Sequence, residues 1–336
     1  MLALTLVPVV VFLGVLVLMD SFKLVRPFAI MVAISWGGLA AFALEPVHRA
    51  LVSGGYVDAQ TLVRYVAPIG EELLKADFVL LLLARHRIGF LVDAAVQGFA
   101  VGAGFALVEN ASYLAAMPDA PALVWIVRGF GTAVLHGGTT AIVAILAKSW
   151  LERRSGSQTV ARCALALLPG LALSTAVHSA YNHLLLPPVA STLLLLIALP
   201  LLLLAVFERS ERATSDWVGG GMDMELARLD ELVSEEFSSS NYGKYLQELK
   251  GRFDGPVVAD MVCLLRLQLE LSVQARALVM ARQAGLSLPP DPDLAPALEE
   301  VAALRRAIGV TGMMALRPLA LSAEQDAFHR NVLTRK

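Results

Sequence analysis

Ionisable side chains lie at four places inside stretches of this sequence that are long and apolar enough to cross a lipid bilayer. They are Glu71 with Glu72, then Glu109, His136 and His178. A charged side chain at the centre of a bilayer costs about 2.5–3.5 kcal/mol on insertion scales. Several such groups are tolerated together only where they face one another, a buried polar site or water. The pattern predicts a helical membrane bundle built around a polar functional site.

The composition agrees with this constraint. Of the 336 residues, 57% are hydrophobic and 17% are charged, whereas soluble domains average about 25% charged residues. A helix needs about 20 apolar residues to cross a bilayer. Stretches of that length lie near residues 2–19, 27–45, 62–84, 89–116, 121–148, 162–186 and 189–207. We therefore expect an all-α protein, with a bundle of about seven transmembrane helices over residues 1–207.

The remainder of the chain has the composition of a soluble domain. Residues 208–222 are predicted to form a linker, because the run TSDWVGGGMD contains three successive glycines. Residues 223–336 are predicted to form a helical cytosolic domain. One of its helices should begin near Pro256 and end at Gly285, and another should end near Gly309. This domain is expected to bind a cytosolic regulator, to support a homodimer or to serve only for packing.

Lysine and arginine are concentrated in alternate loops between the predicted spans. These residues are Lys23 and Arg26, Arg85 and Arg87, Arg153 and Arg154, and Arg209 and Arg212. Short cytoplasmic loops of membrane proteins are enriched in these two residue types. The alternation predicts a multi-pass protein of the cell membrane with its N-terminus outside and its C-terminal region in the cytosol.

Net charge and cysteine content argue against a nucleic-acid-binding protein and against a disulfide-rich one. The net charge is −2, which gives no basis for nucleic-acid binding. Cys163 and Cys263 lie far apart and form no CxxC pair, so no disulfide framework is expected. The composition indicates a protein that resides in a lipid bilayer.

Helix geometry predicts that the ionisable residues lie at similar depths. With a rise of about 1.5 Å per residue, all of them fall within roughly 12 Å of one another along the bilayer normal. Four helices can therefore present them to one cavity that opens towards the outer side. Lys75 lies three and four residues after the two adjacent glutamates, so it can pair with either. Because those glutamates point about 100° apart, only one is expected to face the site.

The residues fall into four motifs. They read EELLK at 71–75, FALVEN at 105–110, HGGTT at 136–140 and HSAYN at 178–182. In order, spacing and placement, this set resembles the PrsW family of intramembrane proteases, over roughly residues 60–190. That family belongs with the type II CAAX prenyl proteases in a superfamily of glutamate-dependent membrane peptidases. Two departures stand out: Glu109 replaces a histidine of the prenyl-protease branch, and Thr140 stands where relatives have an acidic residue.

The resemblance implies an intramembrane endopeptidase that cuts in or near the membrane span of its substrate. The substrate would be a single-pass membrane protein or a membrane peptide. The catalytic residues are expected among Glu71, Glu72, Glu109, His136, His178 and Asn182, with Lys75, Phe105 and Asn110 in support. Either member of the glutamate pair would be the general base on a water molecule. His178 and Asn182, one turn apart on one helix face, would steady the oxyanion.

Other chemistries for the same residues stay open. Glu109, His136 and His178 could hold a catalytic zinc ion, which uses three protein ligands and water. The HExxH signature is absent, and the cofactor-free mechanism is therefore favoured. A proton-coupled or cation-coupled transporter would also need buried ionisable groups. A non-catalytic scaffold that grips partner spans is the third alternative.

Overall fold

A computed structural model describes residues 1–20, 25–153, 159–234, 237–286, 288–289, 291–321 and 323–334. The structure is 85% helical, and no strand occurs in these ranges. The all-α prediction is therefore confirmed. The chain divides into two compact units, Met1–Glu211 and Arg212–Lys336. Lys23 and Arg154, which entered the topology prediction, lie outside the described residues.

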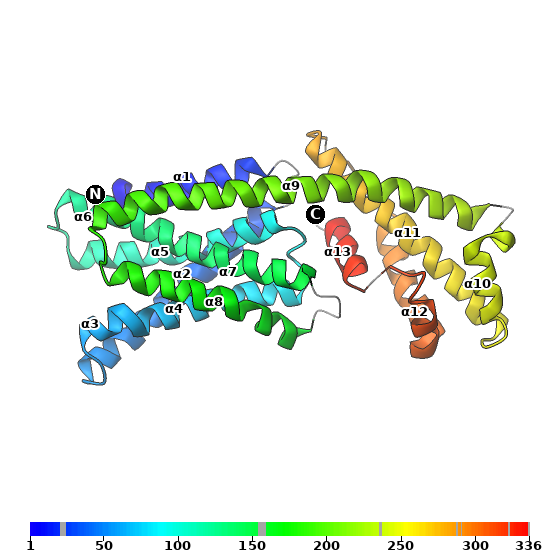
Figure 1. The fold of residues 1–336 in the computed structure, drawn as a ribbon, viewed down its shortest axis with the longest axis horizontal. Coiled ribbons are helices and arrows are strands. Elements are labelled where there is room, and N and C mark those ends of the chain that lie inside the picture. The colour runs from blue at the N-terminus through cyan, green and yellow to red at the C-terminus, as the bar shows by residue number, and fades with distance from the viewer. Residues whose placement is uncertain are drawn as a thin grey trace. The chain divides into compact units, whose positions relative to one another are not determined.

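The first unit is a helical bundle in which long helices run lengthwise beside one another (Figure 1). Its elements are α1 (Leu2–Met19), α2 (Pro27–Ser53), α3 (Ala59–Thr61), η1 (Leu62–Val66), α4 (Ala67–Ala84), α5 (Leu91–Ala116), α6 (Ala122–Ile126), η2 (Val127–Thr132), α7 (Ala133–Arg153), α8 (Val160–Asn182) and the first part of α9 (Pro188–Val233). Helix α5 packs against α1, α2 and α7, and α8 packs against α4 and α7. Because α5 and α7 lie at the centre of the bundle, most of their residues are buried against other helices.

Five helical segments of the described chain are long and apolar enough to cross a membrane. They are Pro27–Ser53, Leu91–Ala116, Ala122–Arg153, Val160–Asn182 and Pro188–Val233. Helix α1 is shorter, and α4 carries Glu71, Glu72, Lys75 and Asp77 within one apolar stretch. The polytopic bundle is confirmed, while the spanning of the bilayer by α1 and α4 stays a prediction.

Glycines let the central helices approach closely. A Cβ atom added at Gly37 would collide with the backbone oxygen of Val101, and one added at Gly102 would collide with the backbone oxygen of His136. Small residues at such crossings allow the backbones of membrane helices to touch. These contacts fix α2 and α7 against α5, the helix that carries Glu109.

Two segments of the bundle have the wider π-helical hydrogen-bonding pattern. One, η1, lies directly before α4, and the other, η2, lies directly before α7. Segments of this kind are rare and occur frequently at functional sites. Each adds to the rotation of the helix that follows, so each affects the direction in which the motif residues of α4 and α7 point.

The second unit contains the C-terminal part of α9, η3 (Phe237–Ser239), α10 (Asn241–Leu249), α11 (Gly255–Gln283), α12 (Leu294–Leu316) and α13 (Ala323–Thr334). Its core gathers around α11, where Met261, Leu264 and Leu265 are buried. The predicted helix between Pro256 and Gly285 is confirmed as α11. Helix α12 continues to Leu316, beyond the expected end, although its backbone breaks at Gly309 (φ 69°).

The predicted linker differs in form from the structure. Residues 208–222 are helical within α9, and the division between the two compact units falls inside that range. Three successive glycines favour a break, because each glycine weakens a helix by roughly 1 kcal/mol relative to alanine. The helix nevertheless continues through them to Val233.

A buried polar network joins three helices of the second unit. Glu225 of α9 accepts hydrogen bonds from Arg276 Nε at 2.9 Å and Nη2 at 2.8 Å, and from Ser272 Oγ at 2.6 Å. His329 of α13 lies 3.4 Å from Ser272 Oγ through its Nε2. Trp217 covers the Arg276 guanidinium at 4.3 Å. The hydrogen bonds of this network depend on the charge states of Glu225, Arg276 and His329.

Replacement of Gly37 by leucine should destabilise the bundle, because the new side chain would meet the backbone of α5. Overpacking of this kind typically costs about 1–3 kcal/mol. The measurement is the unfolding equilibrium of the purified protein in mixed detergent micelles. Gly14→Leu is the matched control, since a Cβ atom there meets nothing within 4 Å. Equal stabilities of the two variants would contradict the close contact.

The stability of the second unit should fall in mild acid. Burial lowers the pKa of His329 from its usual 6.5 to about 4. Between these two values the unfolded chain binds a proton that the folded unit does not, so stability is lost as the pH falls from about 6.5 towards 4. Hydrogen exchange of α11 peptides, corrected for intrinsic rates, should therefore accelerate between pH 7 and pH 5. His329→Gln should remove most of this dependence, and an unchanged dependence would refute it.

Candidate active site

Four helices bring the predicted ionisable residues into one cluster. Glu71 and Glu72 come from α4, Glu109 from α5, His136 from α7 and His178 from α8. The rings of His136 and His178 lie 4.9 Å apart at a nearly perpendicular angle of 86°. The depth argument from the sequence anticipated that these side chains could meet, and the structure places them in direct contact.

Glu72 is the most heavily bonded member of the cluster. Its Oε1 accepts from Lys75 Nζ at 2.6 Å, from His178 Nδ1 at 2.9 Å and from Thr139 Oγ1 at 3.1 Å. The side chains of Glu72 and Lys75 have no exposed surface. Its other oxygen, Oε2, is buried without a hydrogen bond. Glu72 therefore ties α4 to α7 and α8 from a position that solvent does not reach.

His136 is held by charged groups on both sides of its ring. Its Nε2 lies 3.1 Å from Glu109 Oε2, and its Nδ1 lies 3.2 Å from Lys75 Nζ. Phe105 packs on the ring with a centroid distance of 5.0 Å, and the Lys75 ammonium lies 5.1 Å from the centroid of Phe105. Phe105 thus acts as an apolar wall beside the ion pair and the imidazole.

Glu71 differs from its neighbour in both contacts and surroundings. Its Oε2 is buried and makes no hydrogen bond. The same oxygen lies 3.9 Å from His136 Nδ1 and 3.9 Å from His178 Nε2. Glu71 also borders a cavity that Glu72 does not reach. Both glutamates have an oxygen without a hydrogen bond, but only Glu71 borders the cavity from which a ligand could reach it.

The hydrogen-bond partners define the tautomers of both histidines. A carboxylate only accepts, so His178 donates its Nδ1 proton to Glu72 and His136 donates its Nε2 proton to Glu109. This assignment follows from the network. The nitrogens left without a proton are His178 Nε2 and His136 Nδ1. Both nitrogens lie 3.9 Å from Glu71 Oε2. His136 Nδ1 also accepts from Lys75 Nζ at 3.2 Å, so three acceptor atoms lie close together with the lysine ammonium beside one of them.

The site opens into a polar cavity of about 570 Å³. The cavity is lined by the ends of α2, α5 and α8 and by the beginnings of η1, α4, η2 and α7. Its charged and polar lining includes Glu45, His48, Arg49, Glu109, Tyr113, Arg128, His136, His178 and Asn182. The cavity therefore joins the cluster to that end of the bundle where α8 ends and α9 begins.

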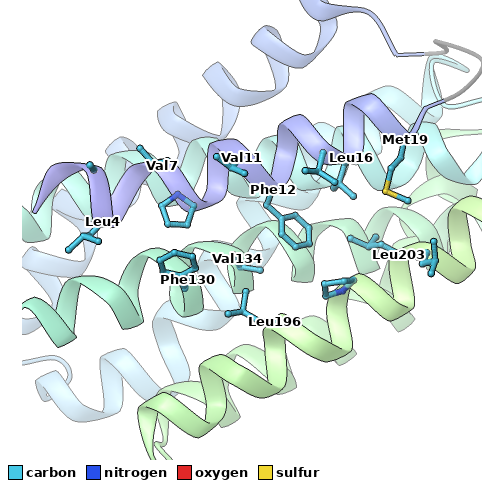
Figure 2. A pocket seen from close by; sticks show the side chains of 15 residues that line it. Leu4, Val7, Val11, Phe12, Leu16, Met19, Phe130, Val134, Leu196 and Leu203 are labelled. Carbon is cyan, nitrogen blue, oxygen red and sulfur yellow. The ribbon is translucent and has the colours of Figure 1, made fainter.

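A second cavity, of about 640 Å³, is entirely apolar (Figure 2). Helix α1 contributes Leu4, Val7, Val11, Phe12 and Leu16 to its lining, and α9 contributes Leu196 and Leu203. Phe130 and Val134, from η2 and α7, complete the wall. With no polar side chain in its lining, this cavity offers no group for acid, base or nucleophilic chemistry.

Asn182 does not stack with His178 as a pair of free donors, which the sequence had suggested. Its Nδ2 donates to the backbone oxygen of Val63 at 2.9 Å, and His178 Nδ1 is engaged by Glu72. Asn182 still borders the polar cavity. An amide nitrogen carries two protons, so Asn182 retains one donor beyond the bond to Val63.

Two polar residues of the site were missed in the sequence. Thr139 belongs to the HGGTT motif and reaches Glu72. Arg128 donates from Nη2 to Glu109 Oε2 at 3.0 Å and from Nε to Asn110 Oδ1 at 3.0 Å. The available signal for Arg128 was a cationic residue well inside the predicted span 121–148, in which the other cation, Lys148, is the last residue. Such interior residues face the inside of a bundle.

The donor atoms suit a zinc ion, which would replace Lys75 Nζ as the partner of His136 Nδ1. Glu71, His136 and His178 each offer one ligand atom, and these atoms lie within 4.8 Å of one another. Three protein ligands of this type are usual in catalytic zinc sites. Both imidazoles are also oriented by a carboxylate on their far side, as metal-bound histidines commonly are. The sequence had proposed Glu109 in this set, but Glu109 lies on the far side of His136, bonded to Arg128 and to His136 Nε2.

A polytopic helical bundle with buried glutamates and histidines beside a polar cavity has the features of an intramembrane hydrolase. Residues 26–206 match the family described as PrsW family intramembrane metalloprotease. The match covers more than half of the 336 residues, and the chain belongs to the PrsW family. Comparisons with curated proteins and with solved structures give no match. Membership confirms the predicted family and supports an intramembrane peptidase embedded in a lipid bilayer.

Proposed function

We propose that the protein hydrolyses a peptide bond in or near the membrane span of a membrane protein, and that Glu71 activates the water. One observation carries this assignment above all. Glu71 Oε2 is buried, makes no hydrogen bond and faces the unprotonated nitrogens of two histidines. A carboxylate positioned in this way can accept a proton from a water molecule bound in the cavity.

The reaction then runs as a general base followed by a general acid step. A water molecule bound between Glu71 and Nε2 of His178 attacks the carbonyl carbon of the substrate as Glu71 takes its proton. The second amide hydrogen of Asn182 stabilises the oxyanion that forms. Glu71 returns the proton to the leaving nitrogen as the C–N bond breaks. The immediate products are a carboxylic acid and an amine. The proton of the acid then passes to the amine, which gives a carboxylate and an ammonium group, so the atoms and charges balance.

Glu72 and Lys75 would have a supporting role in this mechanism. Lys75 compensates the charge of Glu72, and Glu72 accepts the Nδ1 proton of His178. The arrangement keeps the unprotonated Nε2 of His178 directed at Glu71. Partners that orient the ligands of a metal site typically contribute about 10–100-fold to activity, and we expect an effect of that size from Glu72.

The substrate would reach the site through the polar cavity. A single-pass membrane protein or a membrane peptide has a backbone that can enter there. If the N-terminus is outside the cell membrane, as the loop charges predict, the end where α2, α5 and α8 terminate is the outer one. The helical domain over residues 223–336 would then lie in the cytosol, where it can bind a regulator or form a homodimer.

Substitution of the two adjacent glutamates tests the proposal. Cleavage is measured as the rate at which new protein termini form in membranes that contain equal amounts of each variant in folded form. Glu71→Gln should lower this rate about 10²–10⁴-fold, since glutamine cannot take the proton. Glu72→Gln should lower it only about 10–100-fold. A greater loss in Glu72→Gln would refute the assignment, and identical termini in all samples would favour a transporter or a scaffold.

A zinc-dependent form of the same peptidase is the second candidate, because Glu71, His136 and His178 group their ligand atoms within 4.8 Å. A zinc ion held there would act as a Lewis acid on the substrate carbonyl or on water. The residues of the chain would orient the same substrate in either form.

Metal analysis separates the two forms. The cofactor-free mechanism predicts that the purified protein contains less than one equivalent of zinc and that cleavage continues in the presence of a chelator. Loss of cleavage in the chelator, with recovery on addition of zinc, would contradict it. In that case His178→Gln should abolish zinc binding, whereas Asn182→Ala, which removes no ligand atom, should retain the metal.

A further inference from the structure

Arg128 is a cationic residue that the proposed mechanism does not use, although it lies against the active site. It belongs to η2 and borders the polar cavity, with 14% of its side chain exposed. Its Nη2 donates to Glu109 Oε2 at 3.0 Å, and its Nε donates to Asn110 Oδ1 at 3.0 Å. One guanidinium thus bridges two consecutive side chains of α5.

The position of Arg128 is determined from several sides. The guanidinium carbon lies 3.6 Å from the centroid of the Tyr113 ring, which it covers. Asn110 is itself anchored, because its Nδ2 donates to the backbone oxygen of Thr5 in α1 at 3.2 Å. At Gly129, the next residue, a Cβ atom would collide with the backbone oxygen of Leu4. Arg128 is consequently held in place by η2, α1 and α5 together.

The bridge leads directly to the proposed site. Glu109 Oε2 accepts from Arg128 Nη2 at 3.0 Å and from His136 Nε2 at 3.1 Å. A carboxylate inside a membrane bundle is stabilised by a nearby cation, and the fork of a guanidinium fixes its orientation. With Glu109 so fixed, His136 donates Nε2–H and presents its unprotonated Nδ1 towards Glu71.

We propose that Arg128 is a positioning residue of the reaction, which acts through Glu109 on the orientation and hydrogen bonding of His136. Two donor nitrogens of Arg128 are already engaged by Glu109 and Asn110. The Tyr113 ring covers one face of its guanidinium. The effect of Arg128 on catalysis rests on the proposed function. The hydrogen-bond relay from Arg128 to His136 is a property of the folded protein alone.

The relay can be observed without a substrate. Protein labelled with ¹⁵N-histidine is purified in detergent, and the imidazole signals of His136 are assigned by comparison with His136→Gln. The wild type should show a protonated Nε2 with a strongly deshielded proton, as expected for donation to a carboxylate. In Arg128→Gln, and equally in Glu109→Gln, this proton signal should move upfield or be lost by exchange with water.

Arg49→Gln is the matched control for that spectrum. Arg49 borders the same cavity, but it pairs with Glu45 within α2 and is largely exposed. Its removal should leave the His136 signals unchanged. An unchanged Nε2 proton in Arg128→Gln would overturn the proposal. If Arg128→Gln does not fold, Arg128→Lys takes its place, because lysine keeps the charge but cannot bridge Glu109 and Asn110 as a fork. In Arg128→Lys the His136 signal should shift partway towards that of Glu109→Gln. A wild-type His136 signal in this variant would overturn the proposal.

Kinetics on a cleaved membrane substrate then test the catalytic consequence. Arg128→Gln should lower kcat about 10–100-fold with little change in KM. In the Glu109→Gln background it should cause no further loss, because the two residues act in one chain. A raised KM, or losses that multiply in the double variant, would instead indicate direct contact with the substrate. A spectrum that responds in a protein that cleaves nothing would refute the peptidase proposal and leave the relay intact.

Discussion

The buried ion pair of Glu72 with Lys75 is the interaction on which the rest of the bundle depends. Both side chains are fully buried, and their 2.6 Å contact lies where the helices α4, α7 and α8 meet. Removal of one partner from such a pair typically costs about 3–5 kcal/mol, because the other charge is left uncompensated. Lys75 also donates a hydrogen bond to His136, and Glu72 accepts one from His178, so the pair orients both rings. Stability and site geometry therefore share one contact.

Two consecutive glutamates on one helix can divide two tasks between them. Adjacent residues of a helix point about 100° apart, so Glu72 turns into the bundle while Glu71 turns to the cavity. Each histidine donates to one carboxylate, His178 to Glu72 and His136 to Glu109. The other nitrogen of each ring lies 3.9 Å from Glu71 Oε2, and that of His136 also accepts from Lys75. The shared geometry would suit water activation and zinc binding alike, which is why the same residues are proposed for both mechanisms.

The sequence predicted the helical class, the bundle and the four motifs, because charges inside apolar spans leave few arrangements that a bilayer tolerates. It could not decide between Glu71 and Glu72, since that choice depends on helix rotation. The π-helical segments η1 and η2 change this rotation and have no reliable sequence signal. Arg128 was missed for a related reason: its partners, Glu109 and Asn110, lie on another helix. Thr139 and the bond from Asn182 to Val63 likewise became visible only in three dimensions.

The central claim is that Glu71, and not Glu72, faces the cavity and can be reached from water. Cysteine accessibility tests it most directly. In a background with Cys163 and Cys263 replaced by serine, Glu71→Cys and Glu72→Cys are treated with a small water-soluble methanethiosulfonate, and the rates of modification are compared in equally folded samples. The account predicts rapid modification of Glu71→Cys and slow modification of Glu72→Cys. The reverse order would contradict it.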